Sequence, residues 1–277
     1  MSLAARSSAS EVRKLRSNTQ VRFEELEGFD SELELVQNLF ADTYDQASII
    51  SLSGSEATET EFLNRSSRAN IIHVITHGYF AGDEIKSLDQ TNDSGGFDPD
   101  FDSGRAYLGH YLPGLLSGLA MAGANQSSQD AGGTEDGILR ASEIEASPLQ
   151  EVELVVLSAC ETGLGQVAGG EGITGLQRSF QIAGARSVVA SLWKVDDAAT
   201  VELMRQFYTN LWTHKMTRLE ALRQAQLSML DHYDLVSGEM RGLGTKPVKS
   251  STQPKTEGNQ RLHPKFWAAF QLSGDWH

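Results

Sequence analysis

Apolar runs and apolar stripes at helical spacing alternate along the chain after about residue 30. Short apolar runs predict strands at 47–52, 70–76, 153–159, 187–193 and 267–272. Stripes of apolar residues at helical spacing predict helices at 31–41, from about 58, at 173–183, at 204–211 and at 217–231. This alternation is typical of an α/β three-layer sandwich, in which helices cover both faces of a mostly parallel central sheet.

Two long polar segments interrupt the alternation. The first is an insertion at 89–137, rich in Gly, Ser, Asp and Asn, whose apolar piece GLLSGLAMAG predicts a hairpin strand. The second is a loop at 237–262, rich in Lys, Thr, Gly and Pro. We therefore expect a flexible N-terminal segment at 1–30 and one domain at 31–277 that carries both segments.

Composition narrows the classes of protein to consider. The chain has 277 residues, 39% of them hydrophobic, which suffices for one large α/β domain. The net charge of −14 argues against nucleic acid or an anionic membrane as a partner, because both are negatively charged. A single cysteine excludes an intramolecular disulfide framework and a cysteine-rich zinc site. No apolar stretch approaches the roughly 18 residues that cross a bilayer, and no secretory signal is apparent, so a cytoplasmic location is expected.

A histidine and the single cysteine follow two of the predicted strands. In IIHVITHG, His77 and Gly78 come just past the strand end, and in LVVLSACETG, Cys160 does the same. Carboxyl ends of parallel strands share one rim of a sheet, so neighbouring strands would bring imidazole and thiol together. The imidazole could then take the thiol proton, and the N–H groups of Gly78 and Cys160 could hold an oxyanion. The alternative for Cys160 is a buried small hydrophobe.

His73 lies inside the same predicted strand as His77. From its place in the alternation we expect its side chain to point away from the site and to be structural. The remaining histidines have no spacing typical of metal ligands.

Four stretches together resemble a bacterial CHAT domain, a caspase-like cysteine peptidase related to separases and caspases. They are THG, VVLSACETGLG, GGEGITGLQRSFQIAGARSVVASLWKVDD and FWAAFQLSGD, which occur in the family order over roughly residues 30 to 277. The resemblance implies a caspase-like fold and a cysteine endopeptidase of proteins or peptides that needs no cofactor or metal. It carries a catalytic dyad onto His77 and Cys160. Their separation, 160 − 77 = 83 residues, exceeds the roughly 50 typical of caspases, and the 89–137 insertion accounts for the excess.

The resemblance also bears on specificity and control. SACETG departs from the caspase signature Q-A-C-x-G, so a caspase preference for aspartate is not implied. In LWKVDD, Asp196 and Asp197 are candidates for a P1 pocket that binds Arg or Lys. The alternative is helix capping, with Asp197 as the cap and Asp196 reaching inward. Control by an attached repeat module or a partner protein is expected.

A catalytically silent caspase-like adaptor is the rival function. Such an adaptor would need neither His77 nor Cys160, so the presence of both argues for the peptidase.

A calcium site is a further possibility in the insertion. In FDPDFDSG, Asp98, Asp100 and Asp102 alternate as in a calcium loop, but the sixth and twelfth positions do not fit an EF-hand. A looser calcium site and a disordered acidic loop are the two remaining interpretations.

Overall fold

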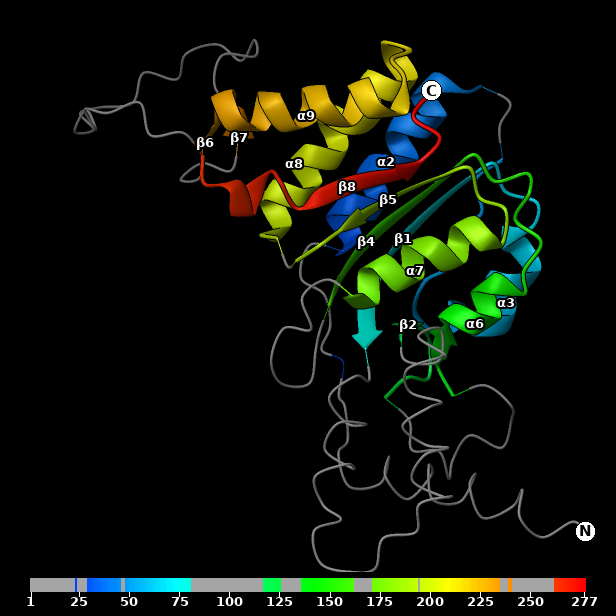
Figure 1. The fold of residues 1–277 in the computed structure, drawn as a ribbon. Coiled ribbons are helices and arrows are strands. Elements are labelled where there is room, and N and C mark those ends of the chain that lie inside the picture. The colour runs from blue at the N-terminus through cyan, green and yellow to red at the C-terminus, as the bar shows by residue number, and fades with distance from the viewer. Residues whose placement is uncertain are drawn as a thin grey trace, which may run out of the picture.

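The computed structural model describes residues 23, 29–45, 48–80, 117–125, 136–161, 171–193, 195–234, 239–240 and 262–277. In these residues a six-stranded sheet lies between two layers of helices, which confirms the expected α/β sandwich (Figure 1). The expected N-terminal segment lies outside the described residues except for Phe23, Phe29 and Asp30, as do most of the 89–137 insertion and of the 237–262 loop.

The sheet has the strand order β3-β2-β1-β4-β5-β8. Its strands are β1 (Ile71–Phe80), β2 (Ser117–Ala120), β3 (Ile138–Arg140), β4 (Leu154–Glu161), β5 (Ser187–Ser191) and β8 (Phe270–Gly274). The pairs β1–β4 and β4–β5 are parallel, while β1–β2, β2–β3 and β5–β8 are antiparallel. Four strands therefore point the same way, and only β2 and β8 run against them. A separate two-stranded ribbon joins β6 (Tyr233–Asp234) to β7 (Glu239–Met240).

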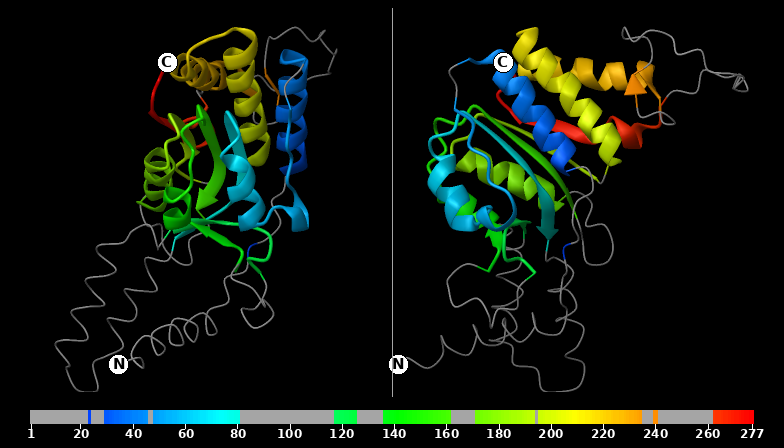
Figure 2. Two further views of the ribbon diagram at one scale, coloured as in Figure 1. Left: turned by 90° about the vertical axis from the view of Figure 1, so that its right-hand side faces the viewer. Right: turned by 180° about the vertical axis from the view of Figure 1, so that it is seen from behind.

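Helices cover both faces of the sheet (Figure 2). One layer consists of α2 (Phe29–Thr43), α8 (Asp197–Tyr208), which a π-helical turn at Thr209–Thr213 continues, and α9 (Arg218–His232). The other layer consists of α3 (Glu59–Ser66), α6 (Ala141–Glu145) and α7 (Glu171–Ile182). Short 3-10 turns at Gly54–Glu56 and Pro264–Phe266 complete the regular elements of the described chain.

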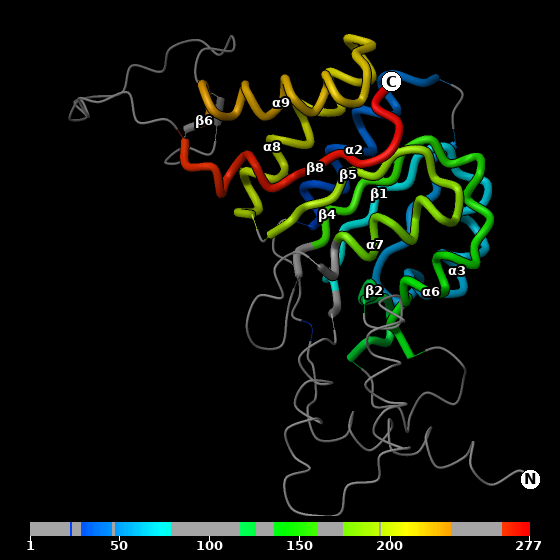
Figure 3. The backbone as a smooth tube through the Cα atoms, viewed as in Figure 1, coloured from blue at the N-terminus to red at the C-terminus, as the bar shows by residue number. Residues whose placement is uncertain are grey.

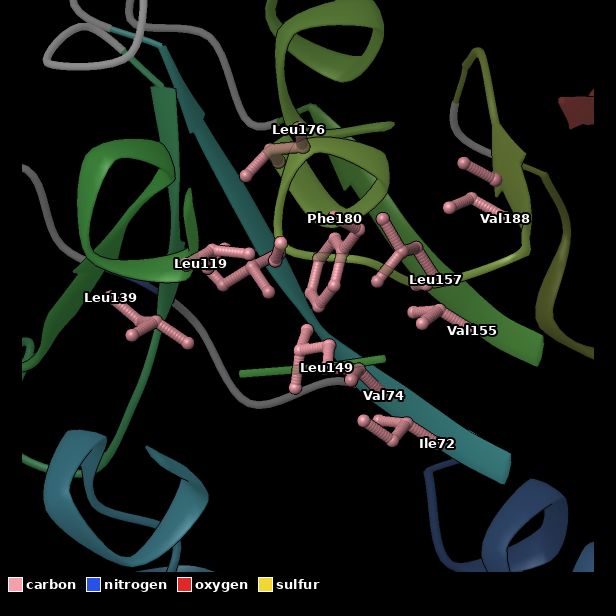
Figure 4. Close-up of a cluster of buried hydrophobic side chains, with 14 of the residues drawn as sticks. Ile72, Val74, Leu119, Leu139, Leu149, Val155, Leu157, Leu176, Phe180 and Val188 are labelled. Carbon is pink, nitrogen blue, oxygen red and sulfur yellow. The ribbon is translucent and has the colours of Figure 1, made fainter. Parts of the chain in front are cut away.

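Strand β4 is buried on both faces. Val155 and Leu157 pack into the cluster around Phe180 of α7, which Figure 4 shows, whereas Leu154 and Val156 pack under α8 and α9. None of these four strand residues is more than 1% exposed. Alternate side chains of a strand point to opposite faces, so two-sided burial explains why its sequence is a continuous apolar run. The candidate cysteine is therefore held near the end of a strand whose first half is buried on both faces.

One predicted strand is wrong and several short elements, among them β3, α6, β6 and β7, were missed. Residues 48–52 have no regular secondary structure, and residue 47 lies outside the described residues. The prediction assumed that this apolar run would be buried. Ile49 and Ile50 are instead 44% and 57% exposed. The hairpin strand expected within GLLSGLAMAG is confirmed as β2. Strand β3 and helix α6 follow the insertion and are too short for a periodic pattern.

The turn that leads into β3 is held by a buried glutamate. Glu59 of α3 accepts hydrogen bonds from the backbone N–H groups of Asp136 at 3.1 Å and Gly137 at 2.6 Å. Burial, together with the charges of Glu143 and Asp136, raises the pKa of the Glu59 carboxyl above its usual range, although the backbone donors oppose this shift. Burial is the largest of these causes, so ionisation of Glu59 destabilises the folded state mainly because its carboxylate is removed from water.

Replacing Glu59 by glutamine should therefore change how stability depends on pH. A raised folded-state pKa contributes stability that is fully present below the unfolded-state pKa and is lost as pH rises through the folded-state pKa. Glutamine keeps an acceptor for the two N–H groups but does not titrate. We expect the unfolding free energy of Glu59→Gln, relative to wild type, to increase between about pH 4 and pH 7 in urea titrations.

Glu61→Gln, on the same helix, is the matched control. Glu61 pairs with Arg65 at 2.6 Å and is partly exposed, so a small change is expected in that variant. Parallel stability curves for wild type and Glu59→Gln between these pH values would contradict the interpretation.

Candidate active site

Strands β1 and β4 lie side by side at the centre of the sheet (Figure 3). Their parallel register pairs His77 with Cys160 and Gly78 with Glu161. The two strands are neighbours, as the sequence analysis expected. Neighbouring strands lie about 4.8 Å apart, so the backbones of the candidate base and the candidate nucleophile lie directly opposite each other.

The expected strand ends are wrong. His77, Gly78 and Cys160 lie inside β1 and β4 rather than just past them. The reason is that β2 pairs antiparallel with the end of β1, with Gly78 opposite Leu119, and so prolongs β1 to Phe80. Gly78 thus lies between two paired strands. It does not lie in the loop that the sequence analysis expected, whereas its role as an oxyanion donor stays a prediction.

A buried polar cluster lies on the α2 and α8 side of the same two strands. His73 is 2.7 Å from the Tyr208 hydroxyl through Nδ1 and 3.1 Å from Glu32 Oε1 through Nε2. The hydroxyl of Ser158 donates to the other carboxylate oxygen of Glu32 at 3.0 Å. A carboxylate only accepts, so His73 donates from Nε2, and in the neutral ring Nδ1 accepts from Tyr208. Burial and the Glu32 charge raise the pKa of Tyr208 well above its usual range, which keeps this hydroxyl protonated.

The orientation expected for His73 is therefore wrong, although its structural role stands. His73 and His77 are four residues apart, and side chains two or four residues apart in a strand share a face. Glu32 of α2 thus contacts β1 at His73 and β4 at Ser158, four and two residues before His77 and Cys160. The cluster holds these strands in register beneath the site.

A groove of about 1030 Å³ follows β1 past both histidines. Its lining includes residues of α2, the segment 48–54, α3, β1 and the stretch 120–125, which begins with the last residue of β2. The walls are largely apolar and include Phe29, Leu33, Val36, Phe40, Ile49 and Phe62. A peptide-sized space with both apolar and polar groups in its walls thus opens beside the candidate base.

Phe23 forms part of the wall of this groove and lies next to His77. The two rings are 5.7 Å apart between centroids and inclined by 31°. The backbone N–H of Phe23 donates to Asn125 Oδ1 at 2.8 Å, and Asn125 Nδ2 donates to the Phe23 carbonyl at 2.8 Å. Sequence reasoning missed both residues, because they are 102 positions apart and belong to no motif.

The two acidic candidates for a P1 pocket begin α8. Asp196 is the N-cap, since its carboxylate accepts from the N–H of Ala199 at 3.1 Å, and its side chain is exposed. The expected division, with Asp197 as the cap and Asp196 reaching inward, is therefore wrong. A helix is capped by the residue just before its first turn, whose side chain accepts from the N–H groups that follow. Before α8 this residue is Asp196.

The calcium site that the sequence suggested cannot be placed in the structure. Asp98, Asp100 and Asp102 lie outside the described residues. Within the described ranges, no group of three or more His, Cys, Asp or Glu residues is arranged to hold a metal ion. None of the helices described is long and apolar enough to cross a membrane.

A family model described as CHAT domain matches residues 3–275, which is nearly the whole chain. The chain belongs to the CHAT family. The caspase-like α/β fold implied by the sequence resemblance is confirmed by this match and by the six-stranded sheet.

Two curated proteins resemble this CHAT domain. Tetratricopeptide repeat protein 28 of Mus musculus and tetratricopeptide repeat protein 28 of Homo sapiens are each 29% identical to it over 225 residues, or 80% of this chain. The aligned region covers 8% of either protein. The chain thus spans less than a tenth of the length of the curated relatives it matches.

Proposed function

We propose that this CHAT domain is a cysteine endopeptidase in which His77 is the general base and Cys160 the nucleophile. The observation that carries the proposal is the register of β1 and β4, which pairs these two residues. Register partners on adjacent strands project to the same face, about 4.8 Å apart, so an imidazole and a thiol there are within reach of one another. This is the arrangement that activates a cysteine for attack on a carbonyl.

The proposed reaction has two halves. His77 takes the proton of Cys160, and the thiolate attacks the peptide carbonyl carbon to form a C–S bond. His77 then gives this proton to the leaving amine as the C–N bond breaks. In the second half, water attacks the thioester while His77 takes a proton from it, the acid product leaves, and the proton returns to the departing sulfur.

Control by a repeat module or a partner protein is part of the proposal. It is supported by the printed names of the relatives, which are tetratricopeptide repeat proteins far longer than this chain. A peptidase active among other proteins needs such restraint.

Labelling with electrophilic peptide ketones tests the proposal. A panel with Arg, Lys, Leu or Met next to the ketone should give one covalent adduct per chain with at least one member, detected as intact mass. Cys160 is the single cysteine of the chain, so the mass increase reports on it without mapping, and Cys160→Ala should show none. The preferred member reports the P1 pocket, and a preference for Arg or Lys would support Asp196 and Asp197.

Iodoacetamide is the control for accessibility. Alkylation by iodoacetamide without labelling by any ketone would show a reachable thiol that does not recognise peptides. That result would favour the catalytically silent adaptor.

A further inference from the structure

We propose that the pocket around Phe23 is a binding subsite for an extended peptide with an aromatic or large aliphatic side chain, and that the chain's own Phe23 occupies it in this structure. The role of this pocket as a substrate subsite rests on the proposed peptidase function. The binding of a peptide there does not, and the experiments below separate the two.

The backbone of Phe23 is held as a substrate backbone would be. One carboxamide, that of Asn125, accepts from its N–H and donates to its carbonyl, both at 2.8 Å. A neighbouring strand makes the same paired bonds to one residue of an extended chain. The two hydrogen bonds from Asn125 involve only main-chain groups of Phe23, so a peptide residue with any side chain could make them.

The side chain of Phe23 enters a pocket that is selective for size. Phe23 is only 9% exposed and packs on Ala120 and Ile138, with Ala124 beside them. Two alanines leave room for a large ring, and the three apolar side chains described around the ring favour an apolar group. The pocket therefore favours aromatic and large aliphatic residues over small or charged ones.

The subsite adjoins the proposed dyad. The Phe23 ring lies 5.7 Å from the imidazole of His77 between centroids. The Thr76 hydroxyl donates to the Ala120 carbonyl, which ties the pocket to β1 one residue before His77. An extended chain advances about 3.3 Å per residue. A peptide seated there would thus present a bond to the dyad within about two residues of its apolar side chain.

A tight turn holds the carboxamide in place. The N–H of Met121 donates to the Gly137 carbonyl at 2.7 Å, and the N–H of Ala124 donates to the Met121 carbonyl at 3.1 Å. Asn125 follows directly. The subsite is thus part of the fold rather than a product of Phe23 alone.

An inert chain with an emptied pocket gives the direct test. The double variant Phe23→Ala, Cys160→Ala is titrated with the fluorescein-labelled peptide TQVRFEELE, which is residues 19–27, up to about 1 mM, the range of intramolecular effective concentrations. Fluorescence polarisation should show binding, and the same peptide with alanine in place of phenylalanine should bind about 10-fold more weakly or worse.

Two matched chains complete the binding test. Adding Asn125→Asp, which puts an acceptor opposite the Phe23 carbonyl, should weaken binding about 10-fold. Cys160→Ala alone, with Phe23 in place, should bind the peptide more weakly than the double variant because the site is already occupied. Equal binding of the two peptides, or no binding by either, overturns the inference, with thermal unfolding confirming that each variant is folded.

Cleavage-site sequencing then separates the two proposals. With active Phe23→Ala chain and a peptide library, an apolar residue should be enriched at one fixed position near the cut, and Asn125→Asp should abolish that enrichment. Cleavage without the enrichment overturns the subsite and leaves the peptidase standing. Peptide binding without any cleavage overturns the peptidase and leaves the pocket standing.

Discussion

Substitution of His77 by glutamine is expected to reduce peptide hydrolysis by about 10³-fold, which is typical of losing a general base. The register partner of His77 is Cys160, and the variant removes the imidazole that we propose takes the thiol proton. His77 is partly exposed, so the fold should tolerate the change. The measurement is the initial rate of digestion of an unfolded protein substrate, with alkylation of Cys160 at neutral pH as a second readout that should slow about 10-fold.

His73→Gln is the matched control, since both histidines lie on one face of β1. His73 is only 9% exposed and contacts Tyr208 and Glu32, so its loss should lower the unfolding free energy by about 2 kcal/mol. Its rate per folded molecule should stay close to wild type. If His73→Gln lost activity as His77→Gln does, the role given to His77 would have to be shared or reassigned.

Substitution of Gly137 by alanine is expected to cost about 3 to 5 kcal/mol of unfolding free energy, because strain and overlap add. Gly137 has φ +76°, and a Cβ there would overlap the backbone of Gly123 and Ala124. Backbone cannot yield as a flexible side chain can. Urea unfolding followed by circular dichroism measures the change.

Gly54→Ala isolates the strain from the overlap. Gly54 has φ +53°, and a Cβ there would have nothing within 4 Å. That variant should lose about 1 kcal/mol. Equal losses at the two glycines would mean that the turn beside Asn125 is loosely packed, which contradicts its role in the subsite.

Long periodic segments were predictable from the sequence, and the reasons are physical. Helices α2, α7, α8 and α9 and strands β1, β4 and β5 bury regular faces, so their apolar spacing reports their structure directly. The run at 48–52 misled because an apolar run indicates burial, yet Ile49 and Ile50 stay exposed. Strand β3 is three residues long and carries no period to detect.

The candidate pair was predictable because parallel strands bring distant residues to a common level. The details around it were not. The length of β1 depends on its pairing with β2, and the orientation of His73 relative to His77 became clear only once β1 was known to continue through His77. The contact between Phe23 and Asn125 depends on how two remote segments meet in space, and no local pattern records it.

The position of β2 and β3 at one edge of the sheet separates two tasks of the molecule. Strand β2 pairs only with the last three residues of β1, and β3 pairs only with β2 among the strands described. Strand β4, which carries Cys160, is instead enclosed on both faces and both edges. If the proposed function holds, sequence changes along β2 and β3 would alter which peptides are accepted without moving the reacting atoms, so selectivity could evolve while the chemistry is kept.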